Sequence, residues 1–278
     1  MRTVRLPEGS EVPAIGQGTW HMGERRGAAR EEEAALRLGV DLGMTLIDTA
    51  EMYGDGGAEE VVGAAISGQR ERVFVVSKVY PHNASRSGIP AACERSLRRL
   101  RTDYIDLYLL HWPGSVPVAE TVLAFEALRE AGKIRRWGVS NFDVTEMGEV
   151  AALPQGTACT TDQVIYHPGA RGIEFDLLPW CTERRMPIMA YSPLGQGGRL
   201  LRSGVLTEIA RRREATPAQI ALAWALRHGT VIAIPKASDV AHVRENAVAG
   251  ELQLAESELD EIDHAFPPPS RKKPLAMV

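Results

Sequence analysis

The sequence has few cysteines, and none of them follows a known functional spacing. The three are Cys93, Cys159 and Cys181, and no two of them form a CxxC pair or a zinc-ligand pattern. An odd number of unpatterned cysteines is typical of a reducing compartment. The histidines show no HxH or HExxH spacing either. We therefore expect neither a disulfide framework nor a bound metal.

Long apolar segments are also missing. No run approaches the ~18 apolar residues of a membrane span, and residues 1–16 lack the apolar stretch of ~7–15 residues that marks a signal peptide. The net charge of −4 disfavours binding to the phosphates of a nucleic acid. The sequence thus predicts a cytoplasmic protein with no membrane and no nucleic-acid partner.

What the sequence does contain is a regular alternation of strand-like and helix-like segments. The strand-like segments are 14–18, 44–48, 72–78, 104–111, 134–140, 159–166, 187–192 and 231–236. Strands that alternate with helices predict a parallel α/β sheet. A length of 278 residues suits one domain, residues 1–278, folded as a (β/α)8 TIM barrel, which commonly has ~250 residues.

Local signals add detail to this barrel. Helix-like segments include 31–43, 58–67, 89–100 and 118–132. Thr216 before Pro217 predicts a capped helix start, and Gly132 and Gly229 predict helix ends. Residues 4–12 alternate around a turn and predict an N-terminal hairpin over the barrel bottom. The proline-rich C-terminal tail, residues 266–278, is expected to pack over the mouth or the side of the barrel.

Four polar residues lie at or just past the ends of strand-like segments. Asp48, Lys78 and His111 each close such a segment, and Tyr53 follows five residues after Asp48. Each alone has an ordinary structural reading, as a helix cap, a solvated lysine, a core histidine or a rim aromatic. In a parallel barrel, however, the carboxyl ends of the strands converge on one face. Together the four suit delivery of a proton to a carbonyl oxygen while hydride reaches the carbonyl carbon.

A second enzyme class uses the same barrel with a different chemistry. Lys78 would then be a Schiff-base nucleophile, as in aldolases. Asp48 argues against this reading, because a lysine paired with a carboxylate stays protonated.

Seven ordered motifs carry a family resemblance. They are GMTLIDTAEMYGDGGAEEVVG (43–63), SKVYP (77–81), LLHWP (109–113), GVSNF (138–142), DQVIYHP (162–168), AYSPLGQG (190–197) and IPKASDVAHVRENA (234–247). Together they resemble the aldo-keto reductases over essentially the whole chain. Within that superfamily the sequence is most similar to bacterial enzymes that reduce methylglyoxal and other small aldehydes.

The resemblance implies a catalytic role for each of the four polar residues. Tyr53 would be the general acid that protonates the carbonyl oxygen, and Lys78 would lower the pKa of its phenol, because a nearby cation favours the phenolate. Asp48 would pair with Lys78 and hold its ammonium in place. His111 would orient the carbonyl and assist proton delivery.

The resemblance also implies a nicotinamide cofactor, NADPH rather than NADH. The implied cofactor-binding residues are Gly18, Thr19, Trp20, Asp48, Ser140, Asn141, Gln163, Tyr191, Ser192, Leu194, Gly195, Lys236, Ser238, His242, Glu245 and Asn246. Asn and Gln side chains offer the donor and the acceptor that a carboxamide needs. No GxGxxG motif opens a helix after the first strand, so a Rossmann site is excluded.

One residue departs from the commonest family pattern at the adenosine phosphate. His242 stands where many relatives carry Arg, and Arg244 would point about 200° away on a helix of 3.6 residues per turn. Lys236 and Ser238 still favour NADPH.

The substrate pocket implied by the resemblance contains Trp20, Met52, Tyr80 and Trp112. The segments that follow His111 and Tyr191 are short to modest, which favours a shallow site for small aldehydes and dicarbonyls. We expect a monomer that acts on a small carbonyl compound. The alternative is a regulatory subunit that senses the cofactor through the same barrel.

Overall fold

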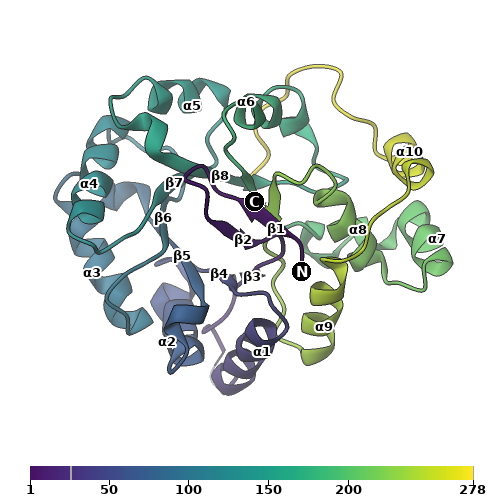
Figure 1. Ribbon diagram of the computed structural model, residues 1–278, viewed down its shortest axis with the longest axis horizontal. Helices are drawn as coiled ribbons and strands as arrows, with labels where there is room; N and C mark the ends of the chain where they lie inside the picture. The colour runs from purple at the N-terminus through teal and green to yellow at the C-terminus, as the bar shows by residue number, and fades with distance from the viewer. Residues whose placement is uncertain (26, 278) are drawn as a thin grey trace.

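Parallel strands form the centre of the molecule, as the computed structural model shows (Figure 1). The structure describes residues 1–25 and 27–277, and within them an eight-stranded sheet runs in chain order from β3 to β10. The strands are β3 (Gln17–Gly18), β4 (Leu46–Asp48), β5 (Phe74–Val79), β6 (Leu107–Leu110), β7 (Trp137–Ser140), β8 (Cys159–Ile165), β9 (Ile188–Tyr191) and β10 (Val231–Ala233). Each lies within one of the eight predicted segments or extends one residue beyond it.

The sheet closes on itself where its first and last strands meet. Parallel bridges join Ile15 to Ala233 and Gly18 to Lys236. The amide of Gly16 donates to the carbonyl of Ala233 at 2.8 Å, and that of Gly18 donates to the carbonyl of Pro235 at 3.0 Å. These contacts confirm the predicted (β/α)8 barrel, and they leave no open edge along this seam.

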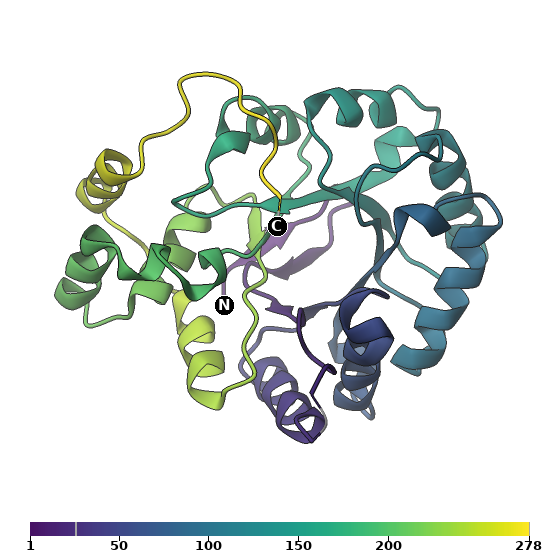
Figure 2. The same cartoon turned by 180° about the vertical axis from the view of Figure 1, so that it is seen from behind.

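Helices surround the barrel in both views (Figures 1 and 2). They are α1 (Ala29–Asp41), α2 (Gly57–Ile66), α3 (Gly88–Leu100), α4 (Val118–Glu130), α5 (Val144–Ala151), α6 (Leu177–Glu183), α7 (Gly204–Arg212), α8 (Pro217–Ala225), α9 (Val240–Ala249) and α10 (Glu256–Ala265). The predicted start of α8 is confirmed, because the Thr216 hydroxyl accepts from the Gln219 amide. None of the helices in the described residues is long and apolar enough to cross a bilayer.

The alternation of side chains along each strand decides which residues face the barrel interior. Leu46 of β4, Val76 of β5 and Leu109 of β6 belong to the inner core cluster, whereas their sequence neighbours pack in the layer between strands and helices. Side chains two residues apart share a face of a strand. Asp48 and Lys78 therefore follow Leu46 and Val76 on the inner face, one layer closer to the mouth.

The two ends of the barrel are covered differently. Strands β1 (Thr3–Arg5) and β2 (Glu11–Pro13) form the predicted hairpin, and Val4 and Val12 pack into the inner core cluster. This hairpin lies across one end of the barrel (Figure 1). The segment after α10 runs to the opposite end, where the C-terminus lies over the middle of the barrel (Figure 2). The tail thus lies over the mouth, within the range of the prediction.

One buried carboxyl group lies outside the barrel interior. Asp162 of β8 is 0% exposed. Its Oδ1 accepts a long hydrogen bond from the Phe142 amide at 3.5 Å, and its Oδ2 has no partner among the described residues. Burial raises the pKa of Asp162 well above its usual value, and the charges of Asp143 and Glu146 act in the same direction.

The barrel seam depends on the absence of a side chain at Gly18. A Cβ there would lie 2.7 Å from the carbonyl oxygen of Ile234, which is closer than such atoms approach. We expect Gly18→Ala to push the strands apart and to lower the free energy of unfolding by about 1–3 kcal/mol, as overpacking does. Chemical denaturation measures this loss. The control Gly148→Ala adds a Cβ in open space, so a similar loss in both variants would contradict the assignment.

The buried Asp162 carboxyl predicts a pH-dependent stability. Because its folded-state pKa is raised, the native protein holds a proton that the unfolded chain releases above about pH 4. The protein therefore loses stability as the pH rises from about 4 through the folded-state pKa. We expect Asp162→Asn to be more stable than the unaltered protein at neutral pH, by a margin that shrinks towards pH 4. Denaturation curves across this range measure the margin, and a margin that is independent of pH would contradict the prediction.

Candidate active site

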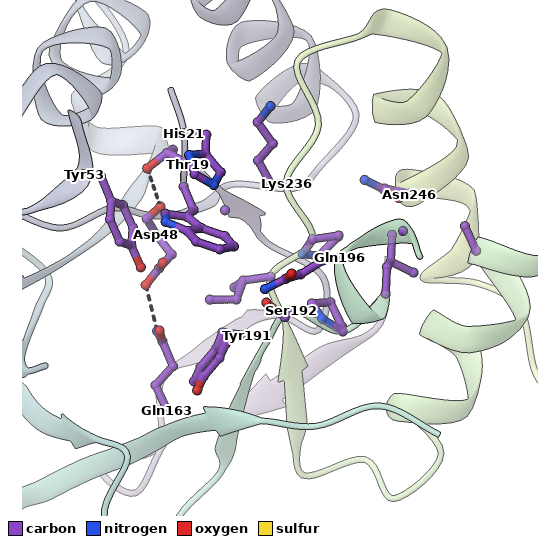
Figure 3. A pocket seen from close by; sticks show the side chains of 18 of the residues that line it. Thr19, His21, Asp48, Tyr53, Gln163, Tyr191, Ser192, Gln196, Lys236 and Asn246 are labelled. Atoms are coloured by element: carbon purple, nitrogen blue, oxygen red, sulfur yellow. Dashed lines mark hydrogen bonds between the residues drawn. The ribbon is translucent and has the colours of Figure 1, made fainter. Parts of the chain in front are cut away.

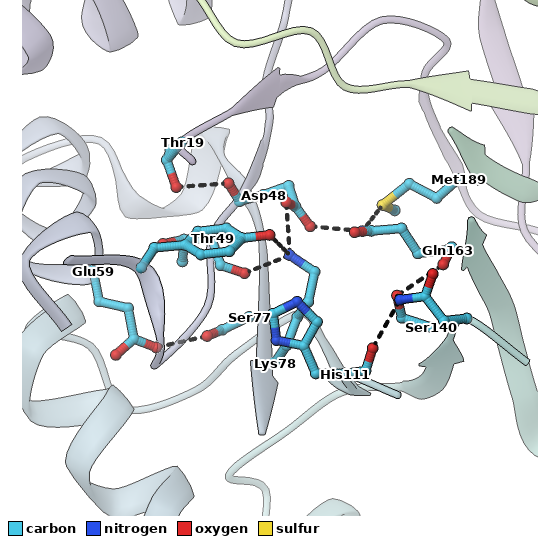
Figure 4. Close-up of polar contacts among 12 residues, drawn as sticks. Thr19, Asp48, Thr49, Glu59, Ser77, Lys78, His111, Ser140, Gln163 and Met189 are labelled. Carbon is cyan, nitrogen blue, oxygen red and sulfur yellow. Dashed lines mark hydrogen bonds and ion pairs between the residues drawn. The ribbon is translucent and has the colours of Figure 1, made fainter. Parts of the chain in front are cut away.

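A buried lysine organises the polar groups at the mouth of the barrel. The ammonium of Lys78 donates to Asp48 Oδ2 at 2.8 Å, to the carbonyl of Thr49 at 2.9 Å and to the phenol oxygen of Tyr53 at 3.1 Å (Figure 4). Lys78 is 0% exposed, so these three oxygens replace its water. The Asp48 carboxylate is held from its other side by Gln163 Nε2 at 2.7 Å.

The same contacts determine the charge states of the cluster. Burial would lower the pKa of Lys78, but the charges of Asp48 and Tyr53 and their hydrogen bonds raise it above its usual value, so Lys78 is a cation. Burial raises the pKa of Tyr53, and the Lys78 ammonium only partly offsets this. The Lys78 cation acts on the phenol pKa in the expected downward direction, but burial outweighs it and leaves that pKa above its usual value.

His111 adjoins the phenol but carries no charge. Its ring meets that of Tyr53 edge to face, with centroids 5.7 Å apart, and its Nδ1 is buried without a hydrogen-bond partner in the described part of the chain. Burial, with a smaller contribution from the Lys78 ammonium, lowers the pKa of His111 to about 2. A neutral imidazole carries one N–H donor and one acceptor nitrogen, so His111 interacts by hydrogen bonding rather than by charge.

Amide side chains form a second polar layer beside this cluster. Asn141 Nδ2 donates to the carbonyl of His111 and to Ser140 Oγ, both at 3.1 Å. Its Oδ1 accepts from the Tyr191 hydroxyl at 2.9 Å, and Ser140 Oγ donates to the carbonyl of Gln163 at 2.8 Å. These bonds fix the ends of β7, β8 and β9 relative to one another.

Several residues of the site hold strained backbone conformations, among them Asn141 and Ser192. Asn141 has a φ of 59° and Ser192 a φ of 45°, values that non-glycine residues adopt uncommonly. Such strain persists where the surroundings over-determine it and is enriched at functional sites. In Asn141, the hydrogen bonds of its side chain to His111 and Tyr191 supply that restraint.

A continuous cavity of about 840 Å³ joins these groups to the side of the barrel near α9 (Figure 3). The sequence-predicted residues that line it are Gly18, Thr19, Trp20, Asp48, Met52, Tyr53, His111, Trp112, Ser140, Asn141, Gln163, Tyr191, Ser192, Leu194, Lys236, His242, Glu245 and Asn246. The fold therefore brings most of the predicted site together around one space.

Four predicted residues do not line the cavity. Lys78 is fully buried and contacts the lining residues Asp48 and Tyr53. Ser238 accepts from the Lys236 ammonium at 3.1 Å and so positions a lining residue. Tyr80 packs edge to face against Trp112, with ring centroids 5.7 Å apart, and is not itself among the residues that line the cavity. Gly195 is also outside the lining.

Sequence reasoning missed several lining residues. They are His21, Pro193, Gln196, Gly197, Leu201, Thr216, Pro217, Ala218, Ile234, Pro235 and Met277. His21 stacks on Trp20 with centroids 4.2 Å apart, and its adjacency to a predicted residue was an available signal. Thr216 and Pro217 had signalled only a helix start. Nothing in the local sequence around Met277 indicates that it reaches this cavity.

The far end of the cavity lies against α9, and its lining includes the Lys236 cation and the Glu245 carboxylate. Lys236 precedes this helix, and His242, Glu245 and Asn246 project from it into the cavity lining. Arg244 is outside the lining. Two amides at the start of this helix are already occupied, because the Asp239 carboxylate accepts from Ala241 and His242 at 2.8 and 3.2 Å. Side chains rather than these two amides would meet an anion here.

Metal ligation has no support in residues 1–25 and 27–277, since no group of three or more His, Cys, Asp or Glu side chains is placed to hold an ion. The three cysteines are buried and unpaired. Burial raises the pKa of the Cys93 thiol to about 12, so this thiol is not a ready nucleophile.

Two bacterial reductases are similar to this chain over almost its whole length. The chain is 57% identical to methylglyoxal reductase YeaE of Escherichia coli (strain K12) over 271 residues, covering 96% of this chain and 95% of that protein. It is 37% identical to glyoxal reductase of Bacillus subtilis (strain 168), covering 94% and 91% of the two chains.

Solved structures agree in fold. An aldo/keto reductase from Klebsiella pneumoniae, crystallised in complex with NADP and acetate, superposes with a TM-score of 0.98 at 53% sequence identity, covering 100% of this chain and 99% of that one. The sequence profile described as "Aldo/keto reductase family" matches residues 14–266. The chain belongs to the aldo/keto reductase family.

Proposed function

We propose that this protein reduces small aldehydes and dicarbonyls such as methylglyoxal with NADPH, and that Tyr53 is the general acid. The observation that carries the proposal is the contact of the buried Lys78 ammonium with the Tyr53 phenol at 3.1 Å. That phenol lines a cavity large enough for a cofactor and a small substrate. The relatives named for methylglyoxal and glyoxal reduction support the same substrate class.

The charge states of the cluster suit proton donation. Because burial keeps the pKa of Tyr53 above its usual value, the phenol carries its proton at neutral pH. When that proton moves to the carbonyl oxygen, the phenolate left behind is stabilised by the Lys78 cation, which Asp48 holds in place. The ammonium therefore interacts more strongly with the product of proton transfer than with the starting phenol, which lowers the barrier.

His111 contributes in a different way. Its pKa of about 2 keeps the imidazole neutral in any ordinary assay, so it is not the primary acid. A neutral N–H directed at the carbonyl oxygen orients the substrate beside Tyr53 and polarises the C=O bond. Its ring contact with Tyr53 places the two donors near one oxygen.

The cavity fits an elongated dinucleotide. Tyr53 and Asn141 line one end and Lys236 and His242 the other. Bound NADPH would supply the hydride. Ser140, Asn141 and Gln163 would hold its carboxamide, and Lys236, with His242 beside it, would meet its 2′-phosphate. NADP in the Klebsiella pneumoniae relative supports this assignment.

Replacing the proposed acid tests the mechanism. We expect Tyr53→Phe to bind NADPH normally and to lose at least ~10²–10⁴-fold of the reduction rate, because the general acid is removed. The rate of NADPH consumption with methylglyoxal measures this loss. Tyr104→Phe, which removes a hydroxyl bonded to the surface residue Glu71, is the matched control. If Tyr53→Phe kept more than half of the unaltered rate with chemistry limiting, Tyr53 would not be the donor.

The Lys236 cation in the cavity lining predicts cofactor preference. Removing one charge-assisted contact costs ~1.5–3 kcal/mol, so Lys236→Ala should weaken NADPH binding roughly ten- to a hundredfold and leave NADH nearly unchanged. His242→Arg should tighten NADPH alone, because it adds a permanent cation. Fluorescence titration with both cofactors measures these affinities. The control is Lys133→Ala, which removes a lysine that pairs with Glu94 and does not line the cavity. Equal losses for NADPH and NADH in Lys236→Ala would refute the phosphate assignment.

A further inference from the structure

The last segment of the chain crosses the barrel mouth as a strap, defined here as residues 266–277. It follows α10 without further helix or strand, and it ends over the middle of the barrel (Figure 2). Leu275 packs against the apolar core between the strands and the helices. Met277 reaches the lining of the active-site cavity while remaining 54% exposed. The strap therefore places an apolar side chain at the cavity entrance.

The strap is tied down at two points. At its start, Arg171 donates to the carbonyl of Phe266. Six residues later, the Lys272 ammonium bonds to Asp143 and, at 2.7 and 2.9 Å, to both carboxylate oxygens of Asp176. These charge pairs are exposed, with the Lys272 side chain 41% accessible to solvent, so added salt weakens them.

The two carboxylates that bind Lys272 are themselves fixed. Asp143 accepts from the Val144 amide and Asp176 from the Leu177 amide, each at 2.8 Å, so each caps the start of its helix. These hydrogen bonds position both carboxylates before Lys272 binds. The two aspartate side chains therefore lose little conformational entropy when the ion pairs form. Asp143 also lies only two residues after Asn141, so the strap is attached to the loop that forms the amide layer.

Most residues between Phe266 and Leu275 are exposed, and these two side chains pack against the core. A cavity of about 200 Å³ lies beneath this part of the strap, lined by Asp143, Arg171, Asp176 and the strap residues Lys272 and Leu275 among others. A segment that spans an open space lacks continuous packing there, so its position depends on its few anchors.

We propose that Lys272 is a positioning residue that holds the strap so that Met277 forms one wall of the substrate entrance and selects for small carbonyl compounds. This inference rests on the proposed function, because it assigns a substrate to the cavity that Met277 lines. With Lys272 anchored, Met277 contacts a small substrate and narrows the entrance to a bulky one. Without the Lys272 contacts, Met277 moves away from the entrance.

The first measurement follows the strap itself by amide hydrogen exchange. We expect Lys272→Gln to raise exchange in residues 266–277 roughly threefold to tenfold, the range expected for losing a partly exposed ion-pair network. Lys272→Arg should restore protection. Lys273→Gln, which removes the same charge one residue along, is the matched control and should leave exchange unchanged.

The second measurement separates KM from kcat for a small and a bulky substrate, methylglyoxal and 4-nitrobenzaldehyde. In Lys272→Gln we expect KM to rise for methylglyoxal and to fall for 4-nitrobenzaldehyde, changing their ratio at least about threefold, in line with the small energies of such contacts. The kcat values and the NADPH affinity should stay the same, because the catalytic residues are untouched. Met277→Ala should reproduce the KM change without the exchange change.

Unchanged exchange in Lys272→Gln, or an equal change in Lys273→Gln, would overturn the anchoring role. An unchanged KM ratio in both Lys272→Gln and Met277→Ala would overturn the selective role. If the unaltered protein reduced neither aldehyde, the proposed function would fail instead, and the exchange measurement would still decide whether Lys272 holds the strap.

Discussion

The arrangement of the barrel mouth depends on one cation, the Lys78 ammonium, which is fully buried. A fully buried ammonium is costly unless oxygen atoms replace its hydration. At Lys78 a carboxylate, a backbone carbonyl and a phenol do so. Loss of Asp48 would leave an uncompensated buried charge, so the carboxylate is necessary to the fold. The same requirement brings Tyr53 within 3.1 Å of the ammonium.

The barrel supplies this arrangement through the alternation of its strands. Leu46 and Val76 fill the interior, and Asp48 and Lys78 occupy the next inward positions on the same two strands. Parallel pairing places Asp48 beside Val76, and Lys78 lies two residues further along β5, beside Leu109. The apolar layer below therefore keeps water away from the ion pair, while the mouth above leaves the phenol accessible to a ligand.

The two ends of the barrel serve different purposes. The hairpin packs Val4 and Val12 into the inner core cluster and closes one end with apolar contacts, which suits a purely structural role. The strap crosses the other end on an ion pair and a backbone hydrogen bond, above a small cavity. Breaking contacts of this kind costs less free energy than breaking the apolar packing of the hairpin. This suits an entrance through which substrates pass.

By itself the sequence determined the features that depend on near neighbours. The period of two and the apolar runs locate the strands, so Asp48, Lys78 and His111 are recognisable at strand ends, and Thr216 with Pro217 marks a helix start. Only the tertiary structure decided properties set by distant contacts. The net pKa direction of Tyr53 depends on burial by the whole mouth, Tyr80 turns onto Trp112, and Asp239 takes the α9 amides. Met277 reaches the cavity because Lys272 meets carboxylates 96 and 129 residues away. No local pattern encodes such a contact.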